Sequence, residues 1–400
     1  MQFAKTYFQS LKSYSKSFWL MCLNVLLFIM SFNLLLPEMN AYLTDLGGAD
    51  KKWMILGLWT IAAAIARPFS GKIADSISRK SVMYFGVFVS VIISFLYPFF
   101  ITVGGFLILR FLHGFSTGFH PTGATALIAD VVPKGKRGEA MGIFGVTVSI
   151  GFSLGQAIGS PIKIAFGTDG LFYASGIMGI LSLLFLLKAK EEKINVGPVR
   201  VPVYKRIIPR LNEIIAPEVI QPSLIMFVTA MCSGIYMMIV PDISENLGMQ
   251  NKGLFYLVNV VFMIITRILS GRFYDLFGAR KNLYLGLSLM IVGAIVTGTS
   301  TTVFQFLLSS IIFGIAASIC SPALFAWTAD LALKEFKGRG MATMFIALEL
   351  GIAFGALCTQ IIYNNDHNMV LSLFIFMSIM CVLGIFYLYV TRNVKTNLLN

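Results

Sequence analysis

The chain has 400 residues, of which 57% are hydrophobic and only 12% are charged. The core of a soluble domain cannot bury this much apolar surface, so the composition excludes a soluble protein and indicates a chain that lives in lipid. The formal net charge of +13 is a feature of nucleic-acid-binding proteins as well. Here the positive residues are distributed as in a membrane protein, and we expect no nucleic acid among the partners.

Apolar stretches of about 20 residues recur along the chain, and each is long enough to cross a bilayer as an α-helix. Twelve are predicted, at 18–37, 53–71, 81–100, 103–130, 139–161, 169–188, 222–241, 253–271, 282–300, 303–329, 341–363 and 369–390. The predicted fold class is therefore an all-α membrane protein with 12 transmembrane helices.

Most of the 31 lysines and arginines fall in alternate loops, on one side of the predicted membrane. The positive-inside rule makes that side cytoplasmic. The sequence thus predicts a multi-pass protein of the inner (cytoplasmic) membrane, with both termini in the cytoplasm. The first apolar stretch is too long for a signal peptide and lacks a small-residue cleavage site, so we expect it to remain as the first helix.

A repeat with a period close to 200 residues relates the two halves of the chain. Arg67, Ser70, Gly71 and Asp75 recur as Arg267, Ser270, Gly271 and Asp275, Pro37-Glu38 is echoed by Pro241-Asp242, and Asp130 by Asp330. A parallel repeat of this length is typical of two-lobed transporters. We expect Glu38 and Asp242 themselves to be solvated helix ends.

The repeat predicts two pseudo-symmetric six-helix bundles. We assign residues 1–189 to an N-terminal lobe and residues 222–400 to a C-terminal lobe. The hydrophilic stretch 190–221 between them is rich in proline and basic residues and is read as a cytoplasmic linker. Isoleucines and a leucine at helical spacing within it predict a short amphipathic helix on the membrane surface.

Ionisable residues inside a span are costly, so they are candidates for function. On the fourth span Arg110, His113, Thr117 and His120 are spaced 3, 4 and 3, which places them on one helical face. We predict that they line the substrate cavity, with His120 near the midplane, about 15 Å from the inner end. The alternative is that these groups bond to neighbouring helices and brace the bundle.

Glu349, on the eleventh span, is the one carboxylate that we place deep inside a predicted span. A low dielectric favours its protonated form and a nearby cation its charged form, so it can exchange a proton for substrate. The alternative is a structural ion pair. Asn24, Ser31 and Tyr236 offer further hydrogen bonds to the cavity, although polar residues also hold membrane helices together.

Two motifs carry a resemblance to a known family. The stretch from Gly71 to Lys80 resembles the loop signature between the second and third helices of the major facilitator superfamily, with Ser78 where glycine is usual. Leu109 to Gly114 resembles its fourth-helix signature, with His113 where glutamine is commoner. Gly151 and Gly155 resemble the signature of its 12-helix drug and proton antiporters, but Gln156 replaces the expected proline.

The resemblance also implies a cytoplasmic gate, because in the family the loop aspartates lie near basic residues and close the inner side. The residues that match are Asp75, Arg79, Asp130, Asp275, Arg280 and Asp330. Arg67 and Arg267 lie two turns earlier on their helices, and we expect them to join these clusters rather than to bind an anionic substrate.

These expectations describe a proton-coupled secondary active transporter that works by alternating access. It would export a small organic molecule, drug-like or a metabolite, in exchange for protons. The alternative is a proton-coupled importer of a small, possibly anionic nutrient, and a remote one is a membrane-embedded enzyme. We expect no cofactor and no metal, since no phosphate-binding glycine loop or ligand cluster appears. The partners would be the substrate, protons and the bilayer, and a monomer would suffice.

Overall fold

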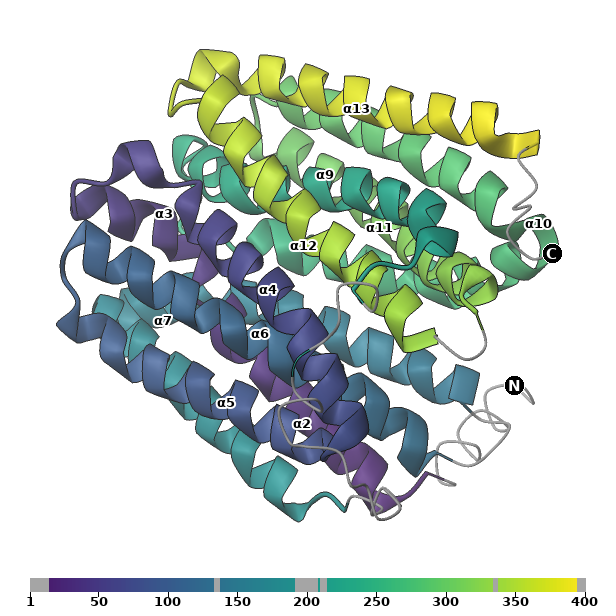
Figure 1. Cartoon of the computed structure of the whole chain (residues 1–400). Coiled ribbons are helices and arrows are strands. Elements are labelled where there is room, and N and C mark those ends of the chain that lie inside the picture. Colours follow the sequence, from purple (N-terminus) through teal and green to yellow (C-terminus); the bar gives the residue numbers. More distant parts are fainter. Residues whose placement is uncertain (1–13, 133–136, 191–207, 209–213, 334–336, 394–400) are drawn as a thin grey trace, which may run out of the picture.

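A computed structural model shows an assembly of helices (Figure 1). It describes residues 14–132, 137–190, 208, 214–333 and 337–393, and every regular element in these ranges is helical. The all-α class is therefore confirmed for the described part of the chain. The amphipathic helix predicted for the linker falls mostly outside the described residues.

In its described residues, the first half contains six α-helices and two short 3-10 helices. These are α2 (Lys16–Asn33), α3 (Leu36–Asp45), η1 (Ala49–Lys51), α4 (Met54–Ser76), α5 (Arg79–Leu96), η2 (Tyr97–Phe99), α6 (Val103–Val131) and α7 (Arg137–Lys188). The second half comprises η4 (Pro217–Val219), α9 (Ile220–Asn246), α10 (Leu254–Gly298), α11 (Val303–Leu331), α12 (Lys337–Ile362), η5 (His367–Met369), α13 (Val370–Val390) and η6 (Thr391–Asn393).

All twelve predicted spans are helical, but in two cases a pair of successive spans is joined into one long helix with a turn inside it. The fifth and sixth spans form α7, and the eighth and ninth form α10. Each of these helices turns at a glycine with positive φ, Gly167 at 73° and Gly278 at 72°. Only glycine adopts this conformation without strain, so both turns are encoded locally. Among the described residues, nine helices are long and apolar enough to cross a membrane, and Leu254–Arg267 is a shorter apolar helix.

The first predicted span is broken into α2 and α3 at Leu34 and Leu35. Pro37 sits in the first turn of α3, where its missing N–H costs nothing. The corresponding Pro241 lies inside α9, which continues through it without a break. The two halves of the repeat thus differ at this proline: the first helix of the first half is broken just before it, and the first helix of the second half continues through it.

The helices form two bundles, which Figure 1 shows as a purple-to-teal group and a green-to-yellow group. Within the first, α2 packs on α7 and α6 on both α4 and α5; within the second, α9 packs on α12 and α10 on α11 and α13. The bundles meet where α4 lies beside α12, which Figure 1 shows, and where α7 packs on α10. This is the pairing expected when two copies of one module face each other across a pseudo-twofold axis.

We name the two ends of the molecule by their contacts. The linker end is where Lys190 meets Ser17 and where Ala216 meets Thr343. The far end is where α3 packs on α9 and where Lys52, just after η1, meets Asp242. The two ends are separated by the full length of the spanning helices.

Glycines allow helices of the same bundle to touch. A Cβ added at Gly355 of α12 would collide with the carbonyl oxygen of Met231 on α9, and one added at Gly155 of α7 would lie 2.9 Å from the Cβ of Asn33 on α2. Small residues at such contacts let helix backbones approach closely.

Gly355→Ala is expected to destabilise the protein, because the new methyl group meets backbone that cannot move aside as a side chain would. Overpacking of this kind costs about 1–3 kcal/mol. A lower thermal unfolding midpoint in detergent would show it. Gly104→Ala is the matched control, since an added Cβ there has nothing within 4 Å. A midpoint that is equal for both variants would contradict the close helix contact.

Candidate functional site

A buried ion pair joins the two bundles near the middle of the molecule. Nη2 of Arg67 on α4 lies 2.7 Å from Oε1 of Glu349 on α12, and the two side chains are only 7% and 8% exposed. Glu349 sits at the centre of the 26-residue helix α12, about 18 Å from either end. The structure thus brings together one residue predicted for the cavity and one predicted for the gate.

The guanidinium of Arg67 is held from both sides of the interface. Its Nη1 donates to Oγ1 of Thr122 at 3.2 Å within its own bundle. Its guanidinium carbon lies 4.6 Å from the centre of the Phe345 ring, one turn before Glu349 on α12. The Ser70 hydroxyl donates to the carbonyl of Gly118 at 2.7 Å and lies 3.2 Å from Oγ1 of Thr122. Thr122 itself donates to the carbonyl of Gly118 at 3.0 Å, which fixes the hydroxyl that receives Arg67. The arginine is therefore pre-positioned for the carboxylate of the opposite bundle.

The second half of the repeat provides a matching contact in the reverse direction. Nη1 of Arg267 on α10 donates to the carbonyl of Gly145 at 3.0 Å and to Oγ of Ser149 at 2.8 Å, both on α7. Positions 145 and 149 are the repeat equivalents of Phe345 and Glu349, 200 residues earlier. Each arginine thus reaches the same two positions of the other bundle, but only one of them meets a carboxylate there.

Two of the fourth-span residues lie inside the first bundle. Arg110 is fully buried, donates from Nε to the carbonyl of Ile55 at 3.1 Å, and stands over the Trp59 ring at 5.4 Å. His113 bonds through Nε2 to Ser90 at 3.1 Å and through Nδ1 to Tyr97 at 3.2 Å. The contacts of both residues are with α4, α5 and η2.

His120 is also buried, in contact with α2. Its Nε2 lies 2.9 Å from Oδ1 of Asn24, and its ring stacks on Phe28 with centroids 3.8 Å apart. Asn24 in turn donates to the hydroxyl of Ser182 at 2.8 Å. Among the described residues the other ring nitrogen, Nδ1, has no hydrogen-bond partner. His120 therefore retains one polar atom that a water or a substrate could engage.

The remaining predicted cavity residues form hydrogen bonds within their own helix or their own bundle. Ser31 donates to the carbonyl of Phe28 at 2.7 Å, and Thr117 to that of Gly114 at 2.9 Å. Tyr236, in the core of the second bundle, bonds to Thr297 at 2.8 Å. Their assignment to a substrate cavity stays a prediction.

The predicted gate is only partly visible. The side chains of Asp75, Asp130 and Asp275 lie outside the described residues. Arg79 donates to the carbonyl of Ala126 at 3.2 Å. Arg280 donates to Gln221 and to the carbonyl of Leu388, both at 3.3 Å. Asp330 is an exposed residue near the end of α11. The gate assignment as a whole stays a prediction.

His113→Leu is expected to lower stability, because it leaves the hydroxyls of Ser90 and Tyr97 without the ring that joins them. A buried polar group deprived of its partner costs about 1–3 kcal/mol. The unfolding midpoint in detergent measures this, and His367→Leu is a suitable control because His367 is exposed. Unchanged stability together with lost transport would instead favour a role of His113 in the cavity.

Two carboxylates of the far end, Glu38 and Asp242, are shielded from solvent and bonded, contrary to the prediction from the sequence. Glu38 is only 4% exposed and receives bonds from Ser160 at 2.6 Å and Lys163 at 2.8 Å. Asp242 receives bonds from Asn40 at 3.0 Å and Lys52 at 3.1 Å. The expectation of solvated helix ends is therefore wrong for both. Their duplication after a proline was the signal that could have identified them.

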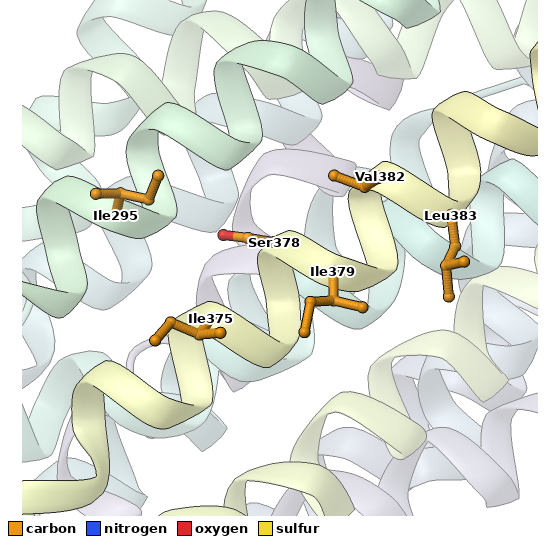
Figure 2. A pocket seen from close by; sticks show the side chains of 6 residues that line it. All are labelled: Ile295, Ile375, Ser378, Ile379, Val382 and Leu383. Atoms are coloured by element: carbon orange, nitrogen blue, oxygen red, sulfur yellow. The ribbon is translucent and has the colours of Figure 1, made fainter.

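An apolar groove also occurs on the outer surface of the second bundle. Figure 2 shows it between Ile295 of α10 and four apolar side chains of α13, with Ser378 at its base. The Ser378 hydroxyl donates to the carbonyl of Phe374 at 2.8 Å. Half-exposed isoleucine and leucine side chains on spanning helices face acyl chains, so we regard this groove as lipid-facing and separate from the site between the bundles.

Comparisons with known proteins agree with this architecture. The family model described as "Major Facilitator Superfamily" matches residues 21–219 and 222–399. An uncharacterized MFS-type transporter of Methanocaldococcus jannaschii is 27% identical over 329 residues, which are 80% of this chain and 84% of that protein. The quinolone resistance protein NorA of Staphylococcus aureus is 27% identical over 172 residues, covering 42% of this chain and 44% of NorA.

A solved structure shares the fold at low sequence identity. The D-xylose–proton symporter superimposes with a TM-score of 0.77 over 94% of this chain and 98% of its own, at 16% identity. At that identity the likeness concerns the fold alone.

Proposed function

Because the chain belongs to the major facilitator superfamily and is a multi-pass membrane transporter rather than an enzyme, we propose that it exchanges protons for a small organic molecule. In this proposal transport is by alternating access, and the direction is export. The molecule carried is drug-like or a metabolite, and a monomer performs the cycle.

The observation that carries the proposal is the ion pair between Arg67 and Glu349. A buried carboxylate is costly without its cation, and the cation here belongs to the other bundle. When the bundles separate at this level, Glu349 loses Arg67 and takes up a proton. When they approach again, Arg67 favours the charged form and the proton leaves. Proton uptake and release are thereby linked to movement of the bundles.

The polar groups around the pair support the same cycle. Thr122 lies in the same bundle as Arg67 and keeps the guanidinium in place, so Arg67 does not need to follow Glu349 when the pair opens. A substrate that carries a positive charge or a hydrogen-bond donor could take the place of Arg67 on the carboxylate. Substrate and proton would then compete for Glu349, which is the requirement for exchange.

Export is favoured by the partial likeness to a drug-resistance protein and by the glycines of α7, which resemble those of the antiporters. Gln156 stands where their proline is expected, and its side chain donates to Asn33 at 3.2 Å. A proton-coupled importer of a small, possibly anionic nutrient is the competing function. It would use Arg67 rather than Glu349 to hold the substrate.

Transport in inside-out membrane vesicles tests the proposal. The vesicle lumen is acidified and contains a pH-sensitive dye, and candidate compounds are added outside. Export by antiport predicts that a substrate releases protons from the lumen. A proton-coupled importer would carry nutrient and protons together from the lumen to the outside, which is its import direction in an inside-out vesicle. The dye would therefore report proton release only when the nutrient is loaded inside.

We also propose the membrane arrangement in which this cycle would run. The N-terminal lobe is residues 1–189, the linker 190–221 and the C-terminal lobe 222–400. Both termini lie in the cytoplasm and the membrane is the inner one, which makes the linker end cytoplasmic. The positive loops of the linker end support this orientation.

A further inference from the structure

Two ion pairs cross the interface at the far end, and they run in opposite directions. Nζ of Lys52 in the first bundle lies 3.1 Å from Oδ2 of Asp242 in the second. Nζ of Lys252 in the second bundle lies 3.8 Å from Oε2 of Glu38 in the first. The lysines are 200 residues apart, and each carboxylate follows a proline of the repeat. Each bundle therefore contributes one lysine and one carboxylate to a reciprocal contact.

We propose that these four residues form a paired gate, which closes the far end of the transporter by holding both bundles together there. We call them the far-end gate. The inference goes beyond the proposed function, because it applies whatever the substrate is and whether or not protons are coupled.

The Glu38 half of the gate is built from several groups. Glu38 is held from its own bundle by Ser160 and Lys163, so its carboxylate is fixed before the other bundle arrives. The backbone N–H of Lys252 donates to Oγ of Ser160 at 3.3 Å. The side chain of the preceding Asn251 donates to the carbonyl of Ala157 at 3.1 Å. The loop that bears Lys252 is therefore seated on α7 by backbone and side-chain bonds as well as by charge.

The Asp242 half is built differently, because the carboxylate is bonded by Asn40 and Lys52 of the opposite bundle. Nδ2 of Asn40, on α3, donates to Asp242 at 3.0 Å and to the carbonyl of Met238 at 2.7 Å, so it crosses the interface twice. Lys52 is the cation that balances Asp242 across the interface.

Opening the far end would break both halves together. The side chains of Lys52 and Asp242 are 14% and 11% exposed, and those of Lys252 and Glu38 are 13% and 5% exposed. Ion pairs this well shielded from water are screened little by salt. On opening, Glu38 would keep Ser160 and Lys163, and Lys252 would keep Glu245 at 2.7 Å. Lys52 and Asp242 would have to find new hydrogen bonds. Because the halves are related by the repeat, a rigid rotation of one bundle against the other separates them at the same time.

The gate is also distinct from the pair in the middle of the molecule. Lys52 directly precedes the turn into α4, and Arg67 lies 15 residues later, which is about 22 Å along the helix. The far-end gate can therefore be altered without touching Arg67 or Glu349.

Spin labels on the two bundles test the proposal. Asp45 at the end of α3 and Asn246 at the end of α9 are both exposed, and each is replaced by cysteine and labelled. The five native cysteines are buried and leave the labelling selective. Distances between the labels are measured by pulsed electron resonance on the full chain in lipid nanodiscs, with Lys52→Gln, Lys252→Gln and the double variant.

Loss of both lysines should raise the population with a longer distance between the labels about tenfold, and each single change should raise it less. The reversed pair Lys52→Asp with Asp242→Lys should return the distances to those of the parent protein. Lys51→Gln is the matched control, because Lys51 pairs at 3.4 Å with Asp50 of its own loop. Unchanged distances in the double variant, or an equal shift in the control, would overturn the gate. If the double variant does not fold, the single variants and the reversed pair provide the test: distances unchanged in both single variants would overturn the gate, and parental distances in the reversed pair would support it.

Discussion

Glu349→Gln is expected to abolish proton movement by the transporter while leaving the protein folded. Glutamine has nearly the same shape as glutamate and keeps an oxygen that can accept the bond from Nη2 of Arg67. It cannot bind and release a proton in the physiological range. Substrate-induced proton release from acidified inside-out vesicles should fall at least tenfold, to the level of empty vesicles.

A second measurement separates the coupling role from a general loss of function. Exchange of labelled for unlabelled substrate across the membrane requires movement of the bundles but no net proton transfer. It should therefore persist in Glu349→Gln for an uncharged substrate, which can donate to the amide oxygen as it would to the carboxylate. Asp169→Asn is the matched control, because Asp169 is an exposed carboxylate in the turn within α7. Proton release that survives in Glu349→Gln would rule out this residue as the coupling group.

Arg67→Met should be the most destabilising of the single changes considered. It removes the cation and leaves the Glu349 carboxylate buried between the bundles with no charge partner. Breaking a buried pair in this way costs about 3–5 kcal/mol. The unfolding midpoint in detergent should fall by several degrees, and the loss should shrink at acid pH, where Glu349 is protonated.

The double variant Arg67→Met with Glu349→Gln completes the test. It removes both charges, so much of the lost stability should return, although transport should not. The coupling energy from this double-mutant cycle measures the interaction between the two side chains. Effects that simply add would mean that the pair contributes nothing to the contact of the bundles, and the proposed cycle would lose its basis.

Much of the architecture was readable from local patterns. Apolar stretches of spanning length predicted the long helices that the structure describes, because a backbone in lipid has to satisfy its own hydrogen bonds and leaves few alternatives to a helix. The short helices α3, η1, η4 and η6 lie mostly or wholly outside those stretches. The turns at Gly167 and Gly278 depend on a single residue type. The merging of four predicted spans into α7 and α10 was not predicted, because the polar residues between the spans, such as Asp169 and Arg280, indicate loops, whereas the helical backbone continues through them and turns at one glycine.

The residues of the central site were found from the sequence, but their pairing was not. Arg67 and Glu349 were predicted to be functional because charged side chains within membrane spans are energetically costly. Arg67 was nevertheless assigned to the gate, since its neighbours along the helix match a gate motif. Arg110 and His113 share a helical face as predicted, yet their bonds run to Ile55, Ser90 and Tyr97 of the same bundle.

The sequence by itself determined the membrane class, the helices and the duplication, since each depends on composition and on spacing along one segment. Only the tertiary structure decided which charges meet. Lys252 and Glu38 are more than 200 residues apart, and the distance between them depends on how the two bundles face each other. Spacing along one helix specifies the face on which a side chain lies, but a contact across the interface is set by the packing of α4 on α12 and of α7 on α10.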